Sequence, residues 1–141
     1  MLKVQMCIAL ALLLGAFVGC DNLGLEDGGG IVTLDGEPLP NAKVEFIPSG
    51  TEGVGSEGTT DEDGKFMMAF SMSQTGVLPG EYTVRISTGE PLTGTPELVP
   101  KKYNLETELS ETALEGEECY FEFHLETDGE TIEQGAGEQE E

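Results

Sequence analysis

Short runs in which apolar and polar residues alternate occupy most of the chain between residues 30 and 126. In one such run Ala42, Val44 and Phe46 are separated by charged side chains. A period of two is typical of a strand with one buried face, whereas a helix buries residues at a period near 3.6. Because no helical period follows the first nineteen residues, the alternation predicts an all-β domain.

Turn residues divide these runs into about seven short strands. The expected ranges are 30–34, 42–47, 59–60, 66–70, 81–86, 106–114 and 119–126. We expect hairpins that turn at Asp63-Gly64 and at Glu115-Gly116-Glu117, a mobile glycine-rich loop over 49–58 and a long proline-containing loop over 87–100. This pattern predicts an antiparallel β-sandwich of the prealbumin or immunoglobulin kind.

The N-terminus has the pattern of a secretory signal peptide. Lys3 is followed by an apolar run from Met6 to Val18, which is too short to span a bilayer comfortably. Gly19-Cys20 at its end matches the lipobox at which bacterial lipoproteins are cleaved and acylated. We therefore expect Cys20 to be the lipid attachment site; an unlipidated signal or a retained anchor helix is the alternative.

These features divide the chain into four segments. They are a signal peptide (1–19), a flexible tether (20–29), the β-sandwich domain (30–126) and a disordered acidic tail (127–141). We expect an exported protein whose lipid lies in the cell membrane or the outer membrane and whose domain lies in the periplasm or at the cell surface.

The charge balance is strongly acidic. Six Lys and Arg residues face 28 Asp and Glu residues, which gives a formal net charge of −22. Such a chain repels nucleic acid, so no nucleic-acid partner is expected. Either solubility or adaptation to salty water explains this charge, and we favour these explanations over a dedicated cation-binding role.

Catalytic chemistry has few candidates in this sequence. Cys119 is the one thiol beyond the signal and lipid site, and His124 is the one imidazole. They are five residues apart on one predicted strand, so their side chains point to opposite faces and cannot form a nucleophile–base pair. We expect no enzyme activity and no cofactor.

Two places in the sequence carry groups that could bind a metal ion. The stretch beginning at Asp61 lacks the glycine and the glutamate that a calcium loop needs at its sixth and twelfth positions. Glu122, His124 and Glu126 share one strand face and are weak candidate metal ligands, although such a set is usually only a solvated surface. The prediction is therefore that there is no metal site.

A candidate ligand patch lies at Lys101, Lys102 and Tyr103, the one place where two basic residues adjoin an aromatic side chain. The alternative is that Tyr103 docks the long loop onto the sandwich and that the lysines only flank it. Glycan stacking has few platforms because the chain contains no Trp, which leaves Tyr103 and Tyr120.

Several segments resemble carboxypeptidase regulatory-like domains. They are residues 30–46 (GIVTLDGEPLPNAKVEF), 60–66 (TDEDGKF), 79–84 (PGEYTV) and 100–103 (PKKY). The last segment, followed by a final hairpin, is similar to small lipoproteins of planctomycete type. The resemblance implies a transthyretin-like, or prealbumin-like, sandwich of seven strands.

The sequence says less about function than about fold. We expect a non-enzymatic, membrane-anchored envelope lipoprotein that acts as a binding or structural module toward an envelope protein or glycan. The first alternative is a lipoprotein that binds a divalent cation or small ligand. A transthyretin-like hydrolase is the remote alternative, because the resemblance implies several histidines there and this chain has one.

Overall fold

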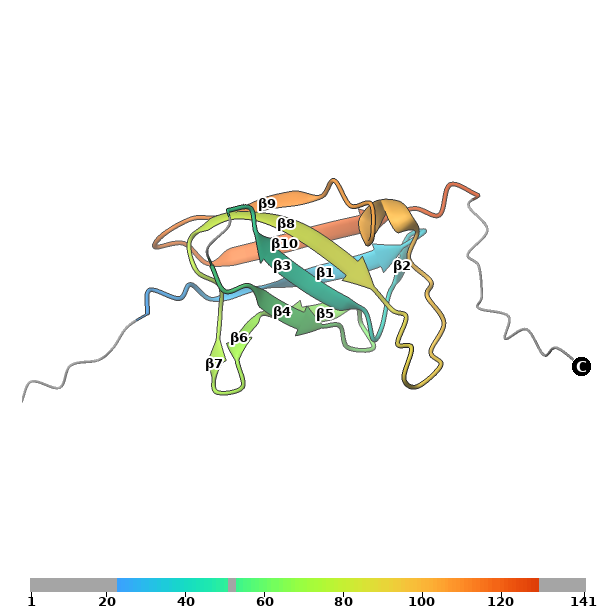
Figure 1. Cartoon of the computed structure of the whole chain (residues 1–141), viewed down its shortest axis with the longest axis horizontal. Helices are drawn as coiled ribbons and strands as arrows, with labels where there is room; N and C mark the ends of the chain where they lie inside the picture. Colours follow the sequence, from blue (N-terminus) through green and yellow to red (C-terminus); the bar gives the residue numbers. More distant parts are fainter. Residues whose placement is uncertain (1–22, 51–52, 130–141) are drawn as a thin grey trace, which may run out of the picture.

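The computed structural model describes residues 23–50 and 53–129. Within these ranges it contains ten strands and one short 3₁₀ helix, η1 (Lys101–Tyr103). The strands form two sheets that pack as a β-sandwich (Figure 1). The predicted all-β sandwich is confirmed, and the described strands outnumber the expected seven because six of them have only two to four residues.

The first sheet is centred on β1 (Gly28–Leu34), which pairs along its whole length with β10 (Cys119–Leu125). This pair is parallel, whereas β1 pairs antiparallel with β2 (Glu37–Pro38) and with β5 (Lys65–Met67). One parallel pair therefore joins the first and last strands of a mostly antiparallel fold.

The second sheet is antiparallel throughout and has the order β7-β6-β4-β3-β8-β9. Its strands are β3 (Lys43–Pro48), β4 (Ser56–Thr59), β6 (Ala69–Ser71), β7 (Gln74–Thr75), β8 (Gly80–Ser87) and β9 (Ser110–Ala113). The long pairing of β3 with β8 forms its centre, as Figure 1 shows.

Aromatic side chains join the two sheets. The ring of Phe46 on β3 lies 4.7 Å from the ring of Phe121 and 6.3 Å from that of Phe123, both on β10. The apolar residues that alternation placed inward are buried, which confirms the faces of β3, β8 and β10: Ala42, Val44, Phe46, Tyr82, Val84, Ile86, Cys119, Phe121, Phe123 and Leu125. Their burial removes apolar surface from water and holds the sheets together.

The loop predicted over 49–58 is wrong at its C-terminal end, where β4 begins at Ser56. Lys43 pairs with Thr59 and Phe46 with Ser56, so β4 extends the second sheet. Its inward positions are Ser56 and Gly58. Neither is apolar, so the period of two that marks other strands is not visible here.

The two expected hairpins are wrong in their pairing, although both turns form. β9 pairs with β8 in the second sheet, while β10 pairs with β1 in the first. Similarly, the turn at Asp63-Gly64 leads from β4 in the second sheet into β5 in the first. Each turn therefore carries the chain between sheets, because the strand that follows it finds its partner on β1.

Candidate functional site

The predicted ligand patch lies on η1, which follows the long loop. The backbone N–H of Tyr103 donates to the carbonyl of Pro100 at 3.0 Å, which closes this single turn. The Tyr103 ring is half-buried and packs against the core, and its hydroxyl accepts a hydrogen bond from the Glu126 N–H at 3.2 Å. Tyr103 thus docks the loop onto β10, which is a structural role.

The two lysines of this patch differ in their surroundings. Lys102 pairs with Asp128, and its ammonium lies 4.9 Å from the centroid of the Tyr103 ring. The hydrogen bond to Asp128 raises the pKa of Lys102. Lys101 is exposed and forms no ion pair with a described residue. Of the two lysines in the predicted patch, only Lys101 therefore presents a positive charge that no described carboxylate balances.

Two of the weak metal candidates, Glu122 and His124, lie on the outer face of β10, as the alternation predicts, and Glu126 follows the end of that strand. His124 Nδ1 is hydrogen-bonded to the Thr33 hydroxyl at 2.9 Å, across the β1–β10 pair. Between residues 23 and 129, leaving out 51–52, no three Glu, Asp, His or Cys side chains gather closely enough to hold a metal ion. Glu122 and Glu126 do not complete a ligand set around His124.

Cys119 and His124 lie on opposite faces of β10, as predicted from their spacing. Cys119 is 8% exposed and its thiol donates to the carbonyl of Glu117 at 3.5 Å. His124 is exposed on the outer face. The thiol and the imidazole therefore cannot act on one substrate atom.

The Asp61 carboxylate stabilises the turn that leads into β5. Its Oδ1 atom accepts hydrogen bonds from the backbone N–H groups of Asp63 and Lys65, each at 2.9 Å. An aspartate whose side chain bonds to the backbone two residues on is an Asx turn. This turn chemistry accounts for the aspartate at position 61.

A carboxylate that sequence patterns did not single out organises the long loop after β8. Glu97 Oε1 accepts hydrogen bonds from the Thr88 N–H and hydroxyl and from the Val99 N–H, at 2.9, 3.1 and 2.9 Å. Glu97 Oε2 accepts from the Gly89 N–H at 3.2 Å. The loop is predicted correctly as irregular. The sequence does not show which of the chain's many acidic residues bonds to the loop backbone, and in the structure Glu97 does so.

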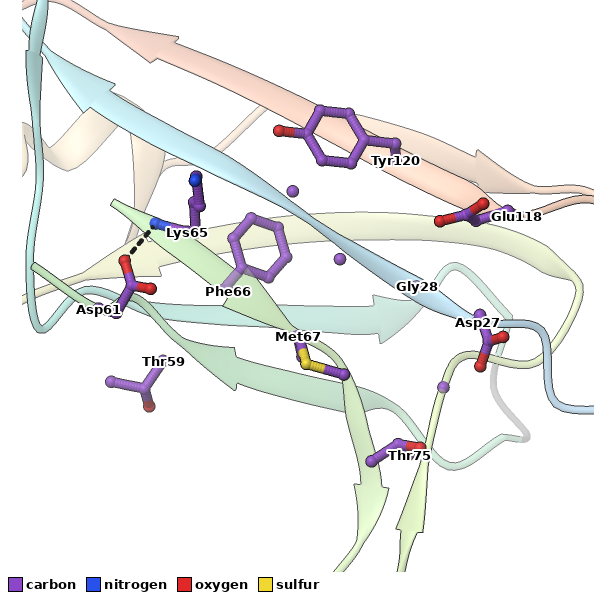
Figure 2. Close-up of a pocket in the computed structure, with 13 residues that line it drawn as sticks. Asp27, Gly28, Thr59, Asp61, Lys65, Phe66, Met67, Thr75, Glu118 and Tyr120 are labelled. Atoms are coloured by element: carbon purple, nitrogen blue, oxygen red, sulfur yellow. Dashed lines mark hydrogen bonds between the residues drawn. The ribbon is translucent and has the colours of Figure 1, made fainter. Parts of the chain in front are cut away.

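An open groove lies over the N-terminal half of β1. Figure 2 shows Tyr120 on β10 on one side of β1 and Met67 on β5 on the other. Gly29 is the register partner of both, so it forms the floor between them. Tyr120 is 60% exposed and Met67 is 73% exposed. A side chain of a partner can therefore contact an aromatic ring and a thioether at once.

Charged groups surround this groove unevenly. Asp27 and Glu118 lie at one end, and Asp61 and Lys65 at the other (Figure 2). Three carboxylates thus face one ammonium group, which favours a partner with basic residues.

The glycines that form the groove floor were expected to belong to the tether, since glycine-rich stretches usually lack regular structure. In the structure β1 already begins at Gly28. Their direct continuation into the apolar residues Ile31 and Val32 is the sequence signal that points to a strand.

Three sequence predictions lie outside the described residues: the signal peptide over 1–19, the lipid site Cys20 and the acidic tail beyond Gly129. No helix in the described part of the chain has the length and apolar character needed to cross a bilayer. Comparison of the chain with protein-family models, with curated proteins and with solved structures found no match.

Proposed function

We propose that this protein is a lipid-anchored, non-enzymatic binding module of the bacterial cell envelope. In this proposal Cys20 carries the lipid, and the sandwich is a carboxypeptidase regulatory-like domain that stands alone. The observation that carries the binding role is the groove over Gly29, bordered by Tyr120 and Met67. The separation of Cys119 from His124 supports binding over covalent catalysis.

The groove has the properties of a recognition surface on a rigid support. Its walls stand on paired strands, so little backbone conformational entropy is lost when a partner docks. Tyr and Met side chains are enriched at protein interfaces because they offer large contact areas. With Asp27, Asp61 and Glu118 around it, we propose an envelope protein that presents an apolar side chain beside basic residues.

Photo-cross-linking in intact cells tests this proposal. A photoreactive amino acid at Met67 should capture one reproducible protein, whereas the same residue at Ile47 should not. Ile47 is a matched control because it is 44% exposed on β3, in the other sheet. Tyr120→Ser should reduce capture at Met67 about tenfold or more, as expected for loss of an aromatic contact at an interface.

Two results would count against the proposal. Equal capture at Met67 and Ile47 would show that contact is nonspecific. Capture that Glu118→Lys leaves unchanged would argue against a basic partner, because this substitution reverses one of the three carboxylates around the groove.

A further inference from the structure

The β6–β7 hairpin projects from the sandwich at the end where the chain enters the domain (Figure 1). Its tip is formed by Met72 and Ser73, between the paired residues Ser71 and Gln74. Relative to a fully exposed side chain, Met72 is 106% exposed. A large apolar side chain at the end of a projecting hairpin is a feature that solvent alone does not favour.

This hairpin is attached directly to the segment that follows the proposed lipid site. Glu26 and Val77 exchange two backbone hydrogen bonds, each of 2.9 Å. The fit is close, because a β-carbon on Gly76, at φ +113°, would lie 2.6 Å from the carbonyl oxygen of Glu26. The base of the hairpin therefore stays next to the chain that leads to Cys20.

The hairpin is also free of charge in a strongly charged chain. Charged residues make up 24% of the sequence, yet residues 66–80 include none. Glu57 on β4 is the register partner of Ala69 and so brings a charge next to the hairpin. Lys43 balances that charge through an ion pair of 3.0 Å. An uncharged projection can approach lipid headgroups of either sign without the repulsion that the rest of this acidic domain meets.

Distances allow the tip to reach the bilayer. Six residues lead from Cys20 to Glu26, which span at most about 20 Å when extended. The five residues from Met72 to Val77 span about 17 Å as a strand. The hairpin is therefore nearly as long as the tether, and its tip can touch the membrane while acyl chains on Cys20 are inserted.

We propose that the β6–β7 hairpin contacts the lipid surface through Met72 and so holds the domain in one orientation on the membrane. This inference rests on the proposed lipid anchor at Cys20. The anchor confines the domain to the surface, and the second, weaker contact fixes how it stands there, as expected when two modest membrane signals combine. The groove, which Thr75 and Gly76 also line, then opens close to the membrane.

Depth-dependent fluorescence quenching tests the contact. The lipidated full chain is reconstituted into phosphatidylcholine vesicles that contain spin-labelled lipid, with an environment-sensitive fluorophore on Met72→Cys. Leu92→Cys is the matched control, because Leu92 is 95% exposed in the loop at the other end of β8. We expect quenching at least threefold stronger at position 72. Both variants are made in a Cys119→Ala background so that only the intended thiol is labelled.

Vesicle flotation separates the two proposals. Co-flotation with equal quenching at positions 72 and 92, or with stronger quenching at 92, overturns the hairpin contact and leaves the anchor intact. Absence of co-flotation overturns both.

Discussion

Gly30 and Phe121 lie backbone against backbone in the parallel β1–β10 pair. A β-carbon on Gly30 would lie 1.8 Å from the carbonyl oxygen of Phe121, closer than any non-bonded contact allows. Because Phe121 also packs against Phe46 across the core, β10 cannot move away without opening the sandwich. Position 30 must therefore be glycine, because β1 and β10 lie too close together there for any side chain.

Gly30→Ala should destabilise the domain by about 3 kcal/mol or more, since an extra methyl group must displace buried backbone. Urea unfolding followed by circular dichroism measures the change. Gly50→Ala is the control, because a β-carbon there meets no atom within 4 Å, and it should alter stability by less than about 0.5 kcal/mol. Equal stability of both variants would show that β10 is not held as described.

Sequence patterns reveal strands that bury apolar side chains, and they fail where other groups fill the inward positions. Phe46 and Phe121 stand in alternating runs, so their faces are predictable. Ser56 and Gly58 on β4 present no large apolar side chain to the core, so this strand resembles a loop. Gly28 and Gly29 begin β1 without any side chain, so they resemble the tether.

It is harder to predict from the sequence which strands pair with each other than to predict where the strands lie. The turn at Gly116 is visible in the sequence, but whether its two arms pair with each other depends on the free edge of β1, which belongs to the opposite end of the chain. The groove depends on the same pairing, because it brings Tyr120 next to Gly29 and Met67. Long-range register therefore decides both the fold and the candidate site.

Glu97→Ala should loosen the loop after β8. It removes the acceptor of four hydrogen bonds and leaves the Thr88, Gly89 and Val99 N–H groups without their partner. Lost partners of partly buried donors cost about 1–3 kcal/mol. Amide hydrogen exchange at these three positions should become at least tenfold faster.

Glu90→Ala provides the comparison for this loop. Glu90 is exposed, and its carboxylate accepts one long hydrogen bond, from the Leu92 N–H at 3.4 Å. Exchange at Thr88 and Val99 should be unchanged in this variant. If Glu97→Ala also leaves exchange unchanged, then backbone contacts alone order the loop.

Glu45 should make stability sensitive to acid. It lies 2.7 Å from Arg85 and 3.2 Å from Lys43 on the outer face of the second sheet. Burial acts to raise the pKa of Glu45, but hydrogen bonds from Arg85 and Lys43 outweigh it and hold the pKa below the ordinary value of 4.5. A depressed folded pKa contributes stability above that value, and the contribution is lost as the pH falls through the folded pKa.

Glu45→Gln should therefore be less stable than the parent at neutral pH, with a difference that shrinks as the pH falls below 4.5. Urea unfolding at a series of pH values measures this. Glu122→Gln is the control, since Glu122 is exposed and forms no ion pair with a described residue. If the free energies of unfolding of Glu45→Gln and of the parent changed with pH in the same way, the lowered pKa of Glu45 would be contradicted.

Cys20→Ala should move the protein from the membrane fraction to the soluble fraction. Acyl chains contribute about 0.8 kcal/mol for each buried methylene, so two or three chains hold a protein firmly while none leaves this acidic domain unattached. Cys119→Ala should remain with the membrane, because that thiol is buried in the core. Mass spectrometry of the N-terminal peptide should find acyl groups on Cys20 in the parent and in Cys119→Ala. A Cys20→Ala variant that stays in the membrane fraction would instead indicate that the apolar run from Met6 to Val18 is retained as the anchor.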